Sequence, residues 1–163
     1  MKVLVIGGAG YIGSHVVYEL IRDNNEVVVM DNLSTGDKSF IHKEVRFYLG
    51  DITKKEDLVK VFKTECEIKP FDVVMHFAAK LIVPESIEKP LEYYHNNVEG
   101  VRLMLETMCE FGIKNIVFSS TAAVYGNPYK EACEEEDITI PINPYGESKL
   151  TCEKMIKWVC MAH

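Results

Sequence analysis

A glycine-rich loop placed directly after a short apolar run is the feature that most constrains how this chain can fold. Residues 1–6 predict a strand buried on both faces of a sheet, and they lead straight into Gly7-Gly8-Ala9-Gly10-Tyr11-Ile12-Gly13. From Ile12 onward the apolar residues recur at helical spacing, so we expect a helix after the loop. A strand, a glycine turn and the open amino end of a helix are together typical of a site that holds a pyrophosphate. A glycine turn that binds nothing is the alternative.

Apolar runs and helical stretches alternate along the rest of the chain. The expected strands are residues 1–6, 27–30, 45–49, 71–76 and 115–119, and the expected helices are residues 12–24, 55–66, 91–111 and 145–163. This alternation indicates β-α-β crossovers and a mostly parallel sheet. Together with the glycine loop it predicts an α/β, Rossmann-like, doubly wound sheet of strand order 3-2-1-4-5, with helices on both faces and one domain over residues 1–163.

Composition excludes several other classes of protein. The chain has 163 residues, which is enough to bury a core without disulfides or metals. Its net charge of −7 argues against nucleic acid and anionic membranes as partners. No apolar stretch approaches the roughly 20 residues that span a bilayer, and the first residues lack a signal-peptide pattern, so we expect a cytoplasmic protein. The five cysteines and five histidines are scattered, so we expect neither a disulfide framework nor a metal site.

Acidic residues stand at the ends of two expected strands. Asp31 follows Gly10 by 21 residues, where a carboxylate would accept hydrogen bonds from the ribose hydroxyls of an adenosine. It would also repel a 2′-phosphate, and no arginine follows in residues 32–36, so NAD is favoured over NADP. Capping of a turn is the other interpretation of Asp31. Asp51 could bond the adenine amino group with Ile52 packed beside it, although Gly-Asp is also ordinary turn chemistry.

A tyrosine and a lysine four residues apart form the most specific chemical feature. Tyr145 and Lys149 share a face of the last expected helix, so the ammonium can lie near the phenol. A nearby positive charge lowers the pKa of a tyrosine, which suits a general base for an alcohol proton. An exposed helical pair is the alternative. Residues 119–121, Ser-Ser-Thr, end a strand where a hydroxyl could bond the same reacting oxygen.

Seven segments of the chain form a joint pattern. They are Gly7 to Gly13, Asp31-Asn32-Leu33-Ser34-Thr35-Gly36, His76-Phe77-Ala78-Ala79, Lys89-Pro90-Leu91-Glu92-Tyr93-Tyr94, Asn96-Asn97-Val98, Ser119 to Gly126, and Asn143-Pro144-Tyr145-Gly146-Glu147-Ser148-Lys149. In this order they resemble the extended short-chain dehydrogenase/reductase family, and the resemblance covers the whole chain. Because members of that family are considerably longer, we expect the C-terminal sugar-nucleotide-binding domain to be absent from this chain.

The resemblance implies NAD-dependent 4-epimerisation of a UDP-hexose, UDP-glucose or UDP-galactose, through a 4-keto intermediate. Tyr145 would take the proton of the C4 hydroxyl while hydride passes to NAD. Lys149 would hold the nicotinamide ribose and lower the pKa of Tyr145, and Thr121 would bond O4. The implied cofactor-binding residues are Gly7, Gly10, Tyr11, Ile12, Gly13, Asp31, Asn32, Ser34, Thr35, Gly36, Asp51, Ile52, Phe77, Ala78, Ala79, Asn96, Ser119, Tyr145 and Lys149.

Related enzymes and assemblies narrow this expectation. Nucleotide-sugar dehydratases of the family carry an Asp-Glu pair directly after the strand-end hydroxyl, whereas Ala122-Ala123 stand here, which favours an epimerase. The resemblance also implies a homodimer through the long helix and the Tyr145 helix. The alternative functions are a nucleotide-binding module without turnover, or another nucleotide-sugar epimerase or dehydratase. Leu81 stands where some epimerases place a cofactor-contacting lysine, and we assign its neighbour Lys80 no role.

His76 is expected to be a structural histidine with satisfied hydrogen bonds.

Overall fold

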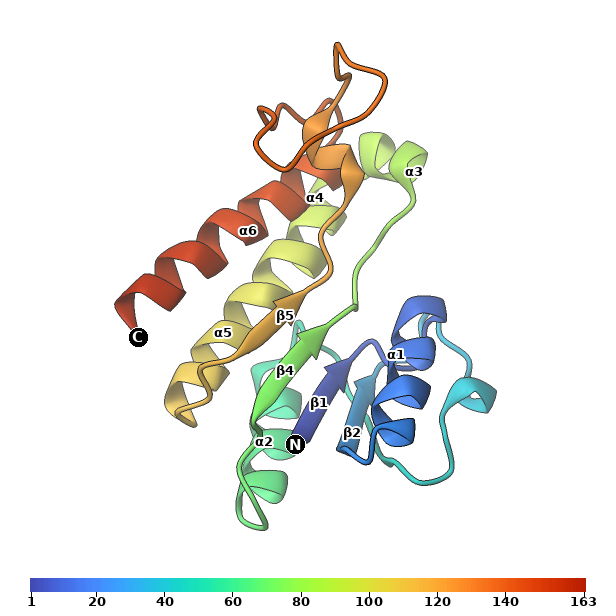
Figure 1. Ribbon diagram of the computed structural model, residues 1–163, viewed down its shortest axis with the longest axis vertical. Coiled ribbons are helices and arrows are strands. Elements are labelled where there is room, and N and C mark those ends of the chain that lie inside the picture. The colour runs from blue at the N-terminus through green and yellow to red at the C-terminus, as the bar shows by residue number, and fades with distance from the viewer.

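Five parallel strands form one sheet in the order β3-β2-β1-β4-β5 (Figure 1). The computed structural model describes residues 1–163. The strands are β1 (Lys2–Ile6), β2 (Glu26–Asp31), β3 (Arg46–Leu49), β4 (Val73–His76) and β5 (Ile116–Phe118). The predicted α/β, Rossmann-like sheet and its strand order are therefore confirmed. All five strands point the same way, so the loops that follow them meet at one edge of the sheet.

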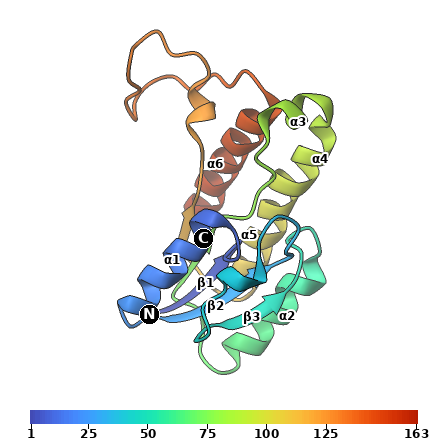
Figure 2. The same cartoon turned by 90° about the vertical axis from the view of Figure 1, so that its right-hand side faces the viewer.

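Helices cover the two faces of the sheet unequally (Figure 2). On one face lies α1 (Tyr11–Arg22), which packs on buried valines such as Val3 and Val29. The other face carries α2 (Lys55–Cys66), α5 (Gly100–Glu110) and α6 (Pro144–Ala162) over a larger core. Alternate residues of β1 supply the two cores, because successive side chains of a strand point to opposite faces. The apolar run therefore reads as a strand buried on both faces, as expected.

Two helix boundaries follow from capping chemistry that is visible in the sequence. Asn24 has a φ of 58°, the left-handed conformation that asparagine tolerates after a helix. At the start of α6, the Oδ1 of Asn143 accepts a hydrogen bond from the Gly146 N–H at 2.8 Å, and Pro144 occupies the first turn. The helix that carries Tyr145 therefore begins where the sequence predicts.

The long helix expected over residues 91–111 is continuous but is not α-helical throughout. It consists of α4 (Pro90–Tyr93), a π-helical segment η2 (Tyr94–Glu99) and α5, which follow one another without a break. A short helix that the sequence analysis did not predict, α3 (Val83–Glu88), comes before it. Two 3₁₀ turns, η1 (Lys38–Phe40) and η3 (Ala122–Tyr125), were also not predicted. These segments are too short to show a periodic pattern, and a π segment adds a residue that periodicity cannot locate.

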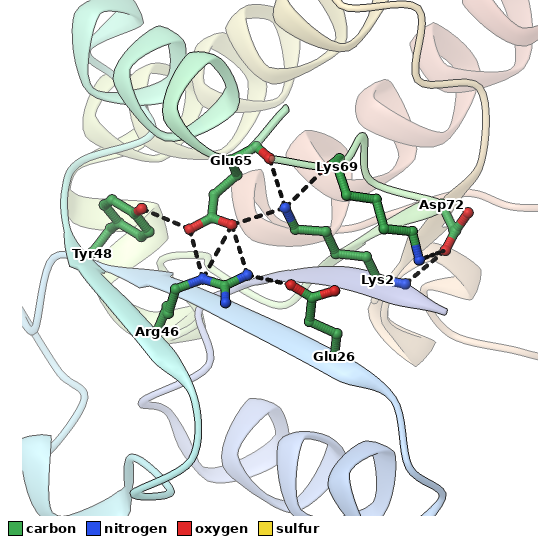
Figure 3. Close-up of polar contacts among 7 residues, drawn as sticks. All are labelled: Lys2, Glu26, Arg46, Tyr48, Glu65, Lys69 and Asp72. Carbon is green, nitrogen blue, oxygen red and sulfur yellow. Dashed lines mark hydrogen bonds and ion pairs between the residues drawn. The ribbon is translucent and has the colours of Figure 1, made fainter. Parts of the chain in front are cut away.

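A closed polar network fills the amino-terminal edge of the sheet (Figure 3). Lys2 Nζ lies 2.9 Å from Glu65 Oε2, with both side chains fully buried, and it also donates to the carbonyls of Glu65 and Lys69 at 2.7 Å each. Arg46 and Tyr48 donate to the same Glu65 carboxylate. Burial alone would raise the pKa of Glu65, but these donors outweigh it and lower the pKa to about 2. In the sequence Lys2 lies within an apolar run, and nothing there predicts this network.

β5 is the edge strand on the side of the sheet opposite β3. No strand pairs with the outer edge of β5, and Val117 is 47% exposed on the face where α1 is the covering helix. Beside that edge, β5, α5 and α6 enclose a cavity of about 300 Å³ with mostly apolar walls. None of the helices combines the length and hydropathy that crossing a bilayer requires.

Candidate functional site

The glycine loop after β1 forms a tight cradle at the carboxyl edge of the sheet. Gly7 has a φ of +83°, and a Cβ built on it would lie 2.4 Å from the backbone nitrogen of Ala78. A Cβ on Gly13 would lie 2.1 Å from the Gly7 carbonyl oxygen. Only glycine fits either position. Gly10 caps α1 without a side chain, so the first amides of the helix, at Tyr11 and Ile12, face outward for an anion.

Asp31 ties the end of β2 to this cradle. Its carboxylate is 9% exposed and accepts the Ala9 N–H at 2.9 Å with one oxygen and the Leu33 N–H at 2.8 Å with the other. Asp31 therefore caps the turn after β2, as the alternative interpretation predicts. Each carboxylate oxygen keeps a further lone pair, so ribose hydroxyls could still donate to Asp31. A Cβ built on Gly36 would lie 3.0 Å from Ala9, so the segment after β2 runs close beside the glycine loop.

The ends of β2 and β3 meet at a second acidic residue. Asn32 Nδ2 donates to Asp51 Oδ2 at 3.2 Å, and Thr53 donates to Asp51 Oδ1 through both its N–H and its hydroxyl. Burial raises the pKa of Asp51, but these bonds outweigh it and leave the pKa below its usual range. Ile52 is 5% exposed and packs in the core against Gly100. The structure therefore places Asn32 and Asp51 together, with Ile52 behind them.

Residues of the predicted cofactor face lie around this edge. Phe77, Ala78 and Ala79 are half-buried directly after β4, and Ser119 is half-buried directly after β5. Asn96 is half-buried in the π segment, and Ser34 and Thr35 are exposed after β2. All of them except Asn96 follow the carboxyl end of a strand. Their contacts with a cofactor stay a prediction.

The predicted catalytic residues come from two segments that pack against each other. Thr121 caps η3 by accepting the Ala123 N–H at 3.2 Å, and Tyr145 lies in the first turn of α6. A Cβ on Gly146 would lie 2.7 Å from the Ala123 carbonyl oxygen, so glycine permits this close approach. The Tyr145 ring stands edge-on to Tyr93 with 6.5 Å between centroids. Thr121 and Tyr145 are thereby held on adjoining turns.

Lys149 is buried one turn further along α6. Its side chain is 2% exposed and forms no ion pair, and its Nζ lies 4.3 Å from the centroid of the Phe118 ring. Burial lowers the pKa of Lys149 to about 8, against smaller effects of Cys152 and Glu153 that raise it. The ammonium is thus held over an aromatic ring at the end of β5. Its interaction with the Tyr145 phenol stays a prediction.

His76 contradicts the expectation of a satisfied structural histidine. It is 1% exposed, and neither ring nitrogen has a hydrogen-bond partner. Burial, followed by the charge of Lys149, lowers the pKa of His76 to about 3, so the ring is neutral. A neutral imidazole still carries one N–H, and leaving such a donor unpaired costs about 1–3 kcal/mol. The expectation was wrong because the side chain points into an apolar core and stacks on Phe118.

Sequence reasoning missed one connecting residue. Asn97, buried in the π segment, accepts the Lys80 N–H at 2.9 Å and donates to the Lys80 carbonyl and to Ser148 Oγ at 3.0 Å each. A buried amide between the segment after β4 and α6 therefore fixes both. The signal was a pair of asparagines within a helical pattern, where asparagine is not favoured. The Lys80 ammonium itself pairs with Glu92 at 2.7 Å.

The fold and motif order match one family over almost the whole chain. A sequence profile of the NAD dependent epimerase/dehydratase family matches residues 3–163. The chain belongs to this family. Among curated members, the UDP-glucose 4-epimerase of Lacticaseibacillus casei is 49% identical over 163 residues, which are 100% of this chain and 48% of that protein.

Solved structures of the family superpose closely on the chain. A crystal structure of UDP-glucose 4-epimerase has a TM-score of 0.94 at 46% identity and covers 99% of this chain and 48% of its own. The UDP-glucose 4-epimerase of Bifidobacterium longum, solved in complex with NAD⁺ and UDP, has a TM-score of 0.92 at 36% identity and covers 99% and 50%. The chain therefore spans about half the length of the relatives it matches.

Proposed function

We propose that this chain binds NAD and supplies the catalytic base for 4-epimerisation of a UDP-hexose, with UDP-glucose and UDP-galactose as the interconverted pair. The observation that carries the proposal is the shared location of two sets of residues. The glycine cradle with Asp31 and the group of Thr121, Tyr145 and Lys149 both lie at the carboxyl edge of one parallel sheet. Ligands of such sheets bind at that edge.

The residues present fit a dinucleotide. A Cβ at Gly7 or Gly13 would collide with the backbone of Ala78 or of Gly7, so the tight loop requires glycine at both positions, and the uncapped amides of Tyr11 and Ile12 suit a pyrophosphate. Asp31 and Asn32 would receive the adenosine ribose, and Asp51 the adenine. Bound at these residues, NAD would supply reversible hydride transfer for C4 of the sugar. The carboxylate of Asp31 would disfavour the 2′-phosphate of NADP.

The chain's own groups would handle the proton and the charge. Tyr145 would remove the proton of the C4 hydroxyl, and Thr121 Oγ1 would bond the same oxygen. Lys149, whose pKa is about 8, would be mostly cationic at neutral pH and would favour the phenolate of Tyr145. Ala122 and Ala123 offer no acid to eliminate water, which favours epimerisation over dehydration.

The proposal extends to assembly and location. We expect a cytoplasmic homodimer that pairs through α4–α5 and α6. Exposed apolar side chains on those helices, such as Leu91 and Trp158, support an interface there. Light scattering on the purified chain tests this, and a monodisperse monomer would contradict it.

The decisive experiment replaces the base. The chain is fused to the second half of the Lacticaseibacillus casei relative, and conversion of UDP-galactose to UDP-glucose is followed with a coupled assay. Tyr145→Phe should lower turnover by about 10²- to 10⁴-fold, because general base catalysis is lost. Tyr18→Phe, an exposed tyrosine on α1, is the matched control and should leave turnover unchanged. Full activity of Tyr145→Phe would refute the proposed role.

A nucleotide-binding module without turnover is the second candidate, and the half-length coverage of the relatives favours it for the isolated chain. Calorimetric titration with NAD and a turnover assay on the 163-residue chain separate the two. We expect binding of NAD without epimerisation. Robust epimerisation by the isolated chain would refute the module.

A further inference from the structure

The buried ammonium of Lys149 contacts an aromatic ring and not a carboxylate. The buried ammonium forms no ion pair, and its Nζ lies 4.3 Å from the centroid of Phe118. A desolvated ammonium needs a substitute for water, and the face of an aromatic ring supplies one. The attraction depends on the cation standing over the ring face, so the orientation of Phe118 decides where the charge is held.

Phe118 is in turn supported by His76. The two residues are register partners on β5 and β4, with ring planes 9° apart and centroids separated by 5.8 Å. Hydrogen bonds do not hold the imidazole there, because both of its nitrogens lack partners. The imidazole contacts the candidate site through its stack on the Phe118 ring. A neutral ring is also the only form that tolerates a cation on the other member of the stack, since a charged imidazole would repel Lys149.

We propose that His76 is a positioning residue for Lys149, and that its stacked ring keeps the face of Phe118 directed at the ammonium. The meaning of this contact for catalysis rests on the proposed function, whereas the contact itself is a property of the isolated chain. The other titratable groups that act on Lys149 are Cys152 and Glu153, both on α6. Glu153 is itself engaged by the Ser120 hydroxyl.

Nuclear magnetic resonance of the 163-residue chain, without cofactor or sugar, tests the proposal. Lysine labelled with ¹³C at Cε is titrated, and Lys149→Arg assigns the signal. In the unchanged chain the Hε protons of Lys149 should be shifted upfield by the Phe118 ring. Phe118→Leu and His76→Leu should each move the titration midpoint of Lys149 to lower pH by about half to one unit, because the charged form loses its ring contact.

Two further variants separate positioning from space filling. His76→Phe retains a flat ring and should keep both the upfield shift and the midpoint. In a double-variant cycle, His76→Leu should have no further effect once Phe118→Leu is present, because His76 acts through that ring. Equal effects of His76→Leu with and without Phe118 would overturn the proposal, and so would a His76→Leu chain with an unchanged Lys149 signal.

The upfield shift of Lys149 needs no variant and covers the case in which His76→Leu does not fold. A random-coil position of those protons in the unchanged chain would overturn the proposal by itself. The experiment contains neither NAD nor a UDP-sugar. Full turnover by Tyr145→Phe would therefore refute the proposed function without affecting the role proposed for His76. An unchanged Lys149 signal in His76→Leu would refute the role of His76 without affecting the proposed function.

Discussion

The two edges of the sheet treat buried polar groups in opposite ways. At the amino edge, Lys2 and Glu65 are fully buried, yet each has several partners, among them Arg46 and backbone carbonyls (Figure 3). At the carboxyl edge, His76 has no hydrogen-bond partner and Lys149 has only the face of a ring. Buried polar groups are normally satisfied, so an edge that leaves them short of partners is arranged for something other than stability. The comparison therefore supports the proposed site at the carboxyl edge without reference to any motif.

The largest effect is expected from a substitution in the polar network at the amino edge of the sheet. Glu65→Gln leaves the buried Lys2 ammonium without a carboxylate and should lower the free energy of unfolding by about 3–5 kcal/mol. Urea denaturation followed by circular dichroism measures this. Lys55→Ala removes an exposed pair with Glu110 and is the control, with an expected loss below about 1 kcal/mol. Equal losses for the two variants would show that the network does not stabilise the fold.

The next effect compares two glycines in left-handed conformations. Gly7→Ala combines a φ of +83° with a backbone contact at 2.4 Å, and should cost about 3 kcal/mol of unfolding free energy together with NAD affinity. Gly112 has a φ of +70° and open space around it, so Gly112→Ala should cost only about 1–2 kcal/mol and leave NAD binding intact. Denaturation and calorimetry measure both. Similar results for the two variants would show that the cradle is not under steric constraint.

The last comparison is a pH dependence that distinguishes the two edges of the sheet. The pKa of His76 is about 3 in the folded chain and about 6.5 when unfolded, so between these values the unfolded chain binds a proton that the folded chain excludes. Stability should therefore fall as pH drops through this window, by about 1.4 kcal/mol per pH unit. His76→Phe should remove this dependence. The contribution of Glu65, whose pKa is about 2, is lost only at lower pH, below about 4.3.

An unchanged slope in His76→Phe would show that other groups control acid unfolding. Thermal denaturation between pH 7 and pH 4 provides the measurement. The exposed His15 and the half-buried His42 stay in both chains, so the difference between the two curves reports on His76 alone.

Features that depend on neighbouring residues could be predicted from the sequence. The strand order, the glycine cradle and the start of α6 follow from local runs, turns and caps, and the motifs placed Asp31, Thr121 and Tyr145 at one edge of the sheet. These features need periodicity, the glycine-loop motif and the strand order usual for the doubly wound fold that carries this motif.

Features that depend on packing between distant segments could not be predicted. Lys2 and Glu65 are 63 residues apart, and nothing local marks either as half of a buried pair. The partnerless state of His76 likewise depends on what lies around it across the sheet. A single extra residue in η2 changes which side chains face α6, and amphipathic spacing cannot detect it.

The buried amide of Asn97 has a mechanical consequence. It bonds both backbone groups of Lys80 and the hydroxyl of Ser148, and the backbone carbonyl of Asn97 accepts a hydrogen bond from the Cys152 thiol at 3.3 Å. The segment that follows β4 and the helix that carries Tyr145 are thereby joined into one rigid body. Under the proposed function, a shift of the segment after β4 would also displace Tyr145, so we expect weaker cofactor binding and misalignment of the base to occur together.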